Sequence, residues 1–218
     1  MIDVLVVKTG VANLASVLAG LRRAGAEPHL GDDPDAVRSA GAVVLPGVGA
    51  FTAGVAGLRE RHLDLAIADR IRAGRPLLAV CLGLQLLLEA SEEGPGEQGL
   101  SVVPGVARRF DAHESVRVPQ LGWNRVIPSA DCQLLQPGYA YFANSYRLVE
   151  PPPGFASAMA YHGGSFVAAF ERGPVLACQF HPELSGTWGI DLIRRWAERA
   201  CRESSSVAAG AAGPEAAC

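Results

Sequence analysis

The sequence lacks an excess of charge of either sign. Its 218 residues include 19 Lys and Arg side chains and 22 Asp and Glu side chains, for a formal net charge of -3. Such a balance gives no electrostatic field that would attract a nucleic acid or an anionic membrane. We therefore expect neither a nucleic acid nor a membrane as a partner.

Paired cysteines and long apolar runs are lacking as well. The five cysteines are scattered and never form a C-x-x-C pair, so neither a disulfide framework nor a zinc site is indicated. The amino-terminal "MIDVLVVKTG" lacks the basic start and long apolar core of a signal peptide. The longest apolar run, around Cys81, is too short to span a bilayer. These absences predict a cytoplasmic protein without a metal ion or another cofactor.

Short aliphatic runs alternate with helical patterns in the first half of the chain. The runs "DVLVV", "AVVLPG" and "PLLAVC" are apolar at nearly every position, as in strands buried on both faces of a parallel sheet. Between the first two runs, Leu14, Val17, Leu18 and Leu21 fall at helical spacing, and Gly25 is placed to end that helix. Between the second and third runs, "LRERHLDLAIADRIRAG" predicts another helical stretch. The pattern predicts an α/β domain with an open, mostly parallel sheet covered by helices on both faces.

The second half of the chain has shorter segments separated by Gly and Pro. "SFVAAF" and "VLACQF", joined by "ERGP", predict a hairpin and so an additional antiparallel portion of the sheet. "GTWGIDLIRRWAERAC" predicts a final helix, whose buried face consists of Ile190, Ile193, Trp196 and Ala197. We expect one domain over residues 1–202. Residues 203–218 are small, polar and free of aromatic side chains, which predicts a disordered tail.

Cys81 lies between the run "PLLAV" and the apolar run "LGLQLLLEA". The sequence "AVCLG" is similar to the nucleophile elbow G-x-S-x-G, with Ala79 at the position of the first Gly. The start of a helix after Cys81 would favour a thiolate, and the backbone N–H of Leu82 would be an oxyanion donor. The alternative is a buried cysteine that only packs. Gln85, on the same face of this helix, either has a partner in the core or points at a ligand.

A nucleophilic cysteine needs a base and a group that orients the base. Of five histidines, His181 lies just past the apolar strand "VLACQF" and is followed by Pro182 and Glu183. In an extended "HPE" segment the side chains of His181 and Glu183 project to one side, so the carboxylate can reach the imidazole. The other histidines lie in polar stretches or near turns.

A glycine-rich loop, "LPGVGAF", ends another predicted parallel strand. Gly47 and Gly49, on either side of Val48, would let the backbone turn its N–H groups towards a ligand, as an oxyanion hole requires. The same sequence is also compatible with a simple turn, and it matches neither G-x-G-x-x-G nor a P-loop.

In this order, "PGVG", "CLGLQ", "GWN", "YFANSYRL" and "QFHPELSG" resemble the class I glutamine amidotransferase family, most closely the glutaminase subunits of imidazole glycerol phosphate synthase. The motifs cover nearly all of residues 1–200. The resemblance implies that Cys81 attacks the carboxamide of L-glutamine, His181 moves the proton and Glu183 orients His181. Oxyanion donors would be Leu82 and Val48 or Gly49. The glutamine would be held by Gly47, Gln85, Asn144, Ser145 and Tyr146.

The resemblance also implies a partner, because free ammonia is almost entirely protonated at neutral pH and is then no nucleophile. In the family this partner is a (β/α)₈ barrel cyclase, which forms a heterodimer with the glutaminase. The cyclase uses the ammonia to make imidazole glycerol phosphate and an aminoimidazole carboxamide ribonucleotide in histidine biosynthesis. Asn13, Gln120 and Trp123 would belong to the interface.

Several positions depart from the family pattern. Lys8 and Thr9 replace an acidic and an aromatic residue, Gln120 and Asn144 replace common histidines, and Leu84 replaces a common Met. These changes leave the triad intact. They leave two alternatives open: a paralogous glutaminase that supplies ammonia to a different synthase, and a catalytically silent subunit that only binds glutamine. A cysteine peptidase would leave Gln85 and the "PGVG" loop without a purpose.

Overall fold

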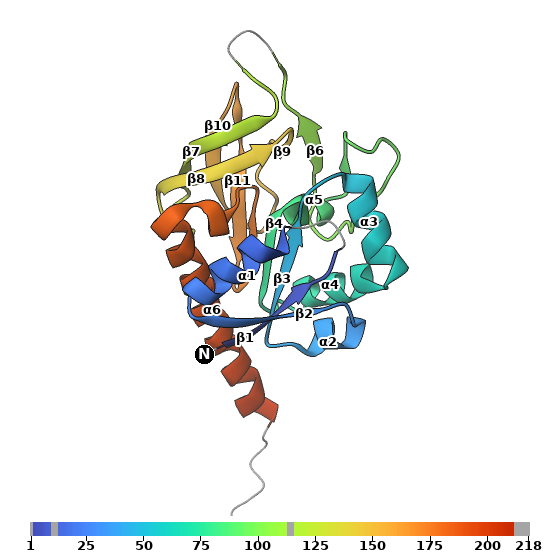
Figure 1. Ribbon diagram of the computed structural model, residues 1–218, viewed down its shortest axis with the longest axis vertical. Helices are drawn as coiled ribbons and strands as arrows, with labels where there is room; N and C mark the ends of the chain where they lie inside the picture. The colour runs from blue at the N-terminus through green and yellow to red at the C-terminus, as the bar shows by residue number, and fades with distance from the viewer. Residues whose placement is uncertain (1, 10–12, 113–115, 212–218) are drawn as a thin grey trace, which may run out of the picture.

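A computed structural model describes residues 2–9, 13–112 and 116–211 of the chain (Figure 1). The strands of its main sheet are β1 (Ile2–Val7), β2 (Ala26–Gly31), β3 (Ala42–Gly47), β4 (Leu77–Cys81), β7 (Gln120–Pro128), β8 (Gly138–Asn144), β10 (Ala156–Tyr161), β11 (Ser165–Arg172) and β12 (Val175–Cys178). This 9-stranded sheet has the order β2-β1-β3-β4-β12-β11-β10-β7-β8. A smaller sheet joins β5 (Ala90–Ser91), β6 (Val106–Arg109) and β9 (Tyr146–Leu148).

The main sheet has a parallel half and an antiparallel half. The strands from β2 to β12 are parallel to their neighbours, and those from β12 to β8 are antiparallel. The predicted hairpin is confirmed, since Ala169 of β11 pairs with Cys178 of β12. The α/β class with an antiparallel extension is therefore confirmed, and the extension is as large as the parallel part.

Helices cover both faces of the parallel half (Figure 1). They are α1 (Leu14–Arg23), α2 (Pro34–Ser39), α3 (Phe51–Glu60), α4 (Leu63–Arg72), α5 (Leu82–Leu86) and α6 (Gly186–Ala211). Alternate residues of β1 point to opposite faces, so Val4 and Val6 belong to one core with α1 and α6, and Leu5 and Val7 to a second core with α3 and α4. This arrangement explains why the central strands are apolar at every position.

Local chemistry fixes where several of the helices begin and end. Asn13 caps α1 by accepting a hydrogen bond from the backbone N–H of Ser16 at 3.5 Å, and Gly25, with φ 89°, follows the helix end. The helical stretch expected over "LRERHLDLAIADRIRAG" consists of two helices, because His62 between them has a left-handed φ of 55°. None of the helices within the described ranges is long and apolar enough to cross a membrane.

The last helix, α6, buries the predicted face, since Ile190, Ile193, Trp196 and Ala197 are all at most 5% exposed. It differs from the sequence expectation in its length. Disorder was predicted for residues 203–218, whereas the helix continues to Ala211, and residues 212–218 lie outside the described part. The segment "ESSSVAAGA" mixes three alanines with serines and a glycine, so its composition did not indicate a helix, but adding residues to a helix already formed costs less than starting one.

Candidate active site

Cys81 occupies the sharp turn between β4 and α5, with φ 55° and ψ −111°. Such a conformation is strained for a residue with a side chain, and it persists where the surrounding structure enforces it. Here the enforcement is close backbone packing: a Cβ atom on Gly83 would lie 2.2 Å from the carbonyl oxygen of Leu45, and one on Gly47 would lie 2.8 Å from Leu82 Cβ. The two glycines make the turn possible.

Ala79, at the position of the first glycine in the elbow pattern, is fully buried in β4. It pairs with Leu45 of β3 and Ala177 of β12 and packs in the core beneath α5. Its methyl group is therefore part of the core packing under the turn.

His181 and Glu183 meet beside this turn. His181 Nδ1 lies 2.9 Å from Glu183 Oε1, and both side chains are buried. The contact does not come from an extended "HPE" segment as expected, because Pro182–Leu184 form a 3₁₀ turn. The backbone N–H of His181 donates to Tyr141 O at 2.9 Å, and the hydroxyl of Ser185 donates to His181 O. The backbone of His181 is thus anchored on β8.

The environment of His181 decides its charge. Burial lowers the pKa of the imidazole, but hydrogen bonds to Cys81 and Glu183 and the charges of these groups raise it more, to about 10. The imidazolium form is consequently favoured at neutral pH, which is the form that can give a proton to a leaving group.

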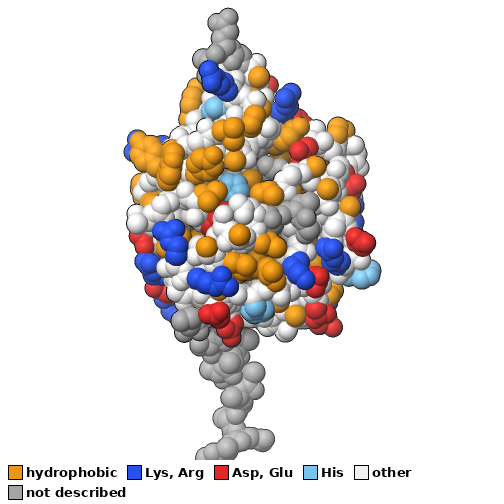
Figure 2. All heavy atoms as spheres, in the orientation of Figure 1, with side chains coloured by type: hydrophobic (Ala, Val, Ile, Leu, Met, Phe, Trp, Pro, Cys, Tyr) orange, Lys and Arg blue, Asp and Glu red, His pale blue; other side chains and the backbone are white. Residues whose placement is uncertain are grey.

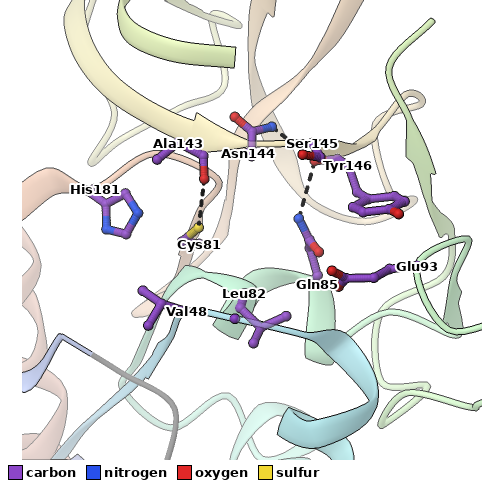
Figure 3. A pocket seen from close by; sticks show the side chains of 11 residues that line it. Val48, Cys81, Leu82, Gln85, Glu93, Ala143, Asn144, Ser145, Tyr146 and His181 are labelled. Carbon is purple, nitrogen blue, oxygen red and sulfur yellow. Dashed lines mark hydrogen bonds between the residues drawn. The ribbon is translucent and has the colours of Figure 1, made fainter. Parts of the chain in front are cut away.

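A cavity of about 270 Å³ opens beside Cys81 (Figure 3). Its lining comes from the loop after β3, the end of β4, α5, the turn after β5, the end of β8 with the start of β9, and the segment that follows β12. The lining residues are Val48, Gly49, Cys81, Leu82, Gln85, Glu93, Ala143, Asn144, Ser145, Tyr146 and His181. The volume suits a small metabolite, and amide, carboxylate, imidazole and thiol groups converge on it. The described residues hold no group of three or more His, Cys, Asp or Glu side chains that could bind a metal ion.

Most of the predicted site residues therefore lie around one cavity, with two exceptions. Gly47 and Glu183 lie behind Val48 and His181, where they line a much smaller cavity of about 10 Å³. Gln85 lines the main cavity and also has protein partners, because its Nε2 donates to Tyr146 O at 3.2 Å and to Gln179 Oε1 at 3.1 Å. Asn144 Nδ2 donates to the same Tyr146 carbonyl at 2.9 Å.

Sequence reasoning missed two residues of the site, Glu93 and Gln179. The Glu93 carboxylate lies at the cavity and accepts a hydrogen bond from the backbone N–H of Phe51 at 2.8 Å, where α3 begins. In the sequence it looks like a surface acid in the turn "SEEGPG", so no signal distinguishes it. For Gln179 a signal existed: it is a polar residue in the apolar run "VLACQF", and a polar side chain in the core needs a partner.

The three residues expected at an interface lie in different surroundings. Trp123 is 58% exposed on β7 and meets Tyr141 edge to face, and Asn13 is exposed at the start of α1. Gln120 is only 5% exposed, which differs from the expectation of a surface residue. The reason is its position opposite Asn144 in the β7–β8 register. The oxygens Gln120 Oε1 and Asn144 Oδ1 have no hydrogen-bond partner among the described residues.

Comparison with known proteins agrees with this geometry. Residues 12–198 match the family model of the class-I glutamine amidotransferases. The chain is 40% identical over 205 residues to the imidazole glycerol phosphate synthase subunit HisH of Symbiobacterium thermophilum, covering 92% of this chain and 96% of that protein. It is 43% identical over 192 residues to the HisH subunit of Thermosynechococcus vestitus, covering 85% of this chain and 91% of that protein.

Solved structures share the fold at lower sequence identity. A crystal structure of a glutamine amidotransferase superposes with a TM-score of 0.71 at 21% identity, covering 90% of this chain and 98% of that chain. The glutaminase domain of Trypanosoma brucei CTPS with bound acivicin superposes with a TM-score of 0.68 at 17% identity, covering 93% and 94%. The chain belongs to the class-I glutamine amidotransferase family, in the branch of the HisH subunits of imidazole glycerol phosphate synthase.

Proposed function

We propose that this chain is the glutaminase subunit of imidazole glycerol phosphate synthase in histidine biosynthesis, hydrolysing L-glutamine and passing the ammonia to a (β/α)₈ barrel cyclase. The observation that carries the proposal is the strained turn that holds Cys81 beside the buried His181–Glu183 pair, at the mouth of a small polar cavity. The high identity to HisH subunits supports the assignment of the pathway.

The first half of the reaction forms a thioester. The Cys81 thiolate attacks the carboxamide carbon of glutamine, and the carbon–nitrogen bond breaks as the His181 imidazolium gives its proton to the leaving nitrogen, which departs as ammonia. Glu183, bonded to His181 Nδ1, holds the ring so that Nε2 faces the reacting atoms. The raised pKa of His181 keeps this proton available at neutral pH.

Negative charge develops on the carboxamide oxygen during the attack. The backbone N–H of Leu82, the first residue of α5, and that of Val48 or Gly49 are the proposed donors to this oxygen. Both segments line the cavity, and Gly47 lies directly opposite Cys81 in the β3–β4 register. The start of α5 and the glycine-rich loop are thereby held against each other across two neighbouring strands.

The second half of the reaction releases glutamate. Water attacks the glutamyl thioester, His181 accepts one proton of the water, Cys81 leaves as the thiolate, and the new γ-carboxyl group gives its remaining proton to the solvent. At the far side of the cavity, Glu93 offers a carboxylate for the α-ammonium group of the substrate. Gln85, Asn144, Ser145 and Tyr146 supply amide and backbone groups for its other polar atoms.

The ammonia must reach the cyclase without entering water, so the partner must dock close to the site. Hydrophobic side chains gather over the part of the surface in Figure 2 where β7 and β8 lie in Figure 1. Leu121, Trp123 and Tyr139 on these strands are 58–67% exposed. A Cβ atom on Gly186 would lie 3.8 Å from Trp123 Cη2, so the indole ring lies over the segment that follows Glu183. A heterodimer through this face in the cytoplasm is part of the proposal.

One assay tests the function: ammonia release from glutamine by the chain alone and with the barrel cyclase. We expect Cys81→Ala to abolish glutamine-dependent synthesis and to leave synthesis from added ammonium salts unchanged, because only the nucleophile is lost. Cys201→Ala is the matched control, since Cys201 is exposed on α6. Glutamine-dependent product from the Cys81→Ala chain, or product formed with a different synthase but not with the cyclase, would contradict the proposal.

A further inference from the structure

Gln179 is a fully buried polar residue of the site with no role in the mechanism above. It follows β12, and its backbone N–H donates to Ala168 O of β11 at 2.8 Å. Its side chain touches the nucleophile: Nε2 lies 3.9 Å from Cys81 Sγ. A buried amide needs partners for both of its ends, and here the partners are two residues of the proposed reaction site.

A backbone carbonyl fixes the orientation of this amide. Tyr146 O can only accept, so Gln85 must turn its NH₂ group towards it, at 3.2 Å. The same NH₂ group reaches Gln179 at 3.1 Å, and since it can only donate, Gln179 must present its Oε1 there. Consequently the Nε2 group of Gln179 faces the sulfur. The donors are therefore fixed: Gln85 donates to Tyr146 O and to Gln179 Oε1, and Gln179 donates to Cys81 Sγ.

The two groups next to Cys81 Sγ favour different protonation states of the cysteine. Ala143 O, at 4.0 Å from Sγ, can accept a hydrogen bond only from the thiol. The Gln179 N–H group donates to the sulfur, and a donor stabilises the charged thiolate more than the neutral thiol. Gln179 thus favours the form of Cys81 that reacts.

We propose that Gln179 is a positioning residue that donates a hydrogen bond to the Cys81 thiolate through Nε2 and holds Gln85 in place through Oε1. Gln179 thereby links the protonation state of Cys81 to Gln85, a side chain that lines the substrate cavity. The inference rests on the proposed role of Cys81 as nucleophile and adds to it a residue two positions before the base His181.

The test measures the rate at which iodoacetamide alkylates Cys81 across a pH series, by mass spectrometry of the full chain. Gln179→Met nearly preserves the volume and removes both hydrogen bonds. We expect alkylation of Cys81 at pH 7 to slow about tenfold, as for the loss of one hydrogen bond to a charged group, and its pH profile to move upwards. The exposed Cys201 is the reference within the same sample, and its profile should stay unchanged.

Gln179→Glu separates the two contacts. Its carboxylate still accepts a hydrogen bond from Gln85 but cannot donate one to the sulfur. Alkylation of Cys81 should therefore slow at least as much as in Gln179→Met, whereas KM for glutamine should change less than in Gln179→Met. Ser157→Ala is the control for a buried polar residue, because Ser157 Oγ is buried on β10 without a partner among the described residues. Alkylation profiles of Cys81 that coincide in wild type, Gln179→Met and Gln179→Glu would overturn the inference.

A measurement on the wild-type chain keeps the test valid if the variants do not fold. The side-chain NH₂ resonances of Gln179 in NMR spectra should move with the same pH profile as the alkylation of Cys81, and resonances that stay fixed would overturn the inference. The proposed function has its own criterion. If the wild-type chain released no ammonia even with the cyclase, the function would fail, whereas an active wild type with unchanged variants overturns only the role of Gln179.

Discussion

At the residue scale, the charge of His181 links catalysis to stability. The pKa of this imidazole, ordinarily 6.5, is raised to about 10 because its contacts with Cys81 and Glu183 outweigh its burial. A group whose pKa is raised on folding stabilises the folded state fully below its unfolded pKa, and this contribution is lost as the pH rises through the folded value. The contribution of His181 is therefore complete below about pH 6.5 and disappears as the pH approaches 10.

Removing the sulfur tests this coupling. In Cys81→Ala the imidazole keeps Glu183 but loses the hydrogen bond and the charge of Cys81, so the pKa of His181 should fall. NMR titration of the imidazole protons, assigned with a His181→Gln variant, measures the value. The free energy of unfolding should begin to decrease near pH 6.5 in both chains, but in Cys81→Ala this decrease should be smaller and should end at a lower pH than in the wild type. An unchanged pKa of His181 would mean that Glu183 alone holds the proton.

The sequence identified several residues of the site but not how they meet. Cys81, His181 and Gln85 stood out because a polar or reactive side chain at the end of an apolar run needs an explanation. Glu93 did not stand out, because a carboxylate in a turn normally faces water. Gln120 was expected at the surface, and its burial follows from its pairing with Asn144, which local sequence does not encode.

At the element scale, a buried arginine joins α4 and α2 to the segment before β4, at the end of β4 opposite Cys81. The Arg70 guanidinium of α4 donates to four backbone carbonyls: Val37 O at 2.8 Å, Arg38 O at 3.1 Å, Ala40 O at 2.7 Å and Pro76 O at 2.7 Å. Burial, and to a lesser extent the charge of Arg75, lower the pKa of Arg70 to about 10. The side chain thus ties the end of α2 to the segment that enters β4.

We expect Arg70→Met to destabilise the fold by roughly 3 kcal/mol, because its carbonyl partners lose their donor in the interior. Urea unfolding followed by circular dichroism measures this loss. Arg72→Met is the matched control: Arg72 belongs to the same helix with its side chain 66% exposed, and should change stability by less than about 0.5 kcal/mol. Equal midpoints for the two variants would contradict the role of Arg70. The glutaminase activity per folded molecule should be the same in both.

Some strands and helices could be predicted from the sequence, and others could not. The buried strands β3 and β4 and the β11–β12 hairpin were predicted because continuous apolar runs between turn residues are strong signals. The edge strand β2 was missed, because "AEPHLG" is polar, contains a proline and pairs with β1 alone. The break between two helices at His62 was missed too, since left-handed backbone at a residue other than glycine has only a weak sequence signature.

At the scale of the whole molecule, the site lies where the parallel half of the sheet meets the antiparallel half. β3, β4 and β12 are neighbours that run in the same direction, so Gly47, Cys81 and the segment after Cys178 meet at one edge. β8, from the far end of the antiparallel half, brings Ala143 and Asn144 over the same cavity. Continuous apolar runs predicted several of these strands, but the order of the strands depends on long-range pairing that no local pattern carries.

The same arrangement places the exposed aromatic face next to the base. Trp123 lies against Tyr141, with ring centroids 6.3 Å apart, and the Tyr141 carbonyl accepts the backbone N–H of His181 at 2.9 Å. A protein that docks on Trp123 is therefore connected to His181 through two contacts, the first from Trp123 to Tyr141 and the second from Tyr141 to the backbone of His181. A partner that binds here can both seal the exit for ammonia and press on the segment that positions His181.

We expect Trp123→Ala to weaken binding of the barrel cyclase by tenfold or more, because large aromatic side chains at the centre of an interface dominate its affinity. Titrating the cyclase into the glutaminase assay gives the apparent Kd and the maximal stimulation. Leu65→Ala is the matched control, since Leu65 is 57% exposed on α4, on the other side of the molecule from β7. If both variants bound the cyclase like the wild type, the docking face would have to lie elsewhere. If Trp123→Ala raised the apparent Kd and also lowered stimulation at saturation, the indole would be needed to transmit binding to His181 as well as to bind.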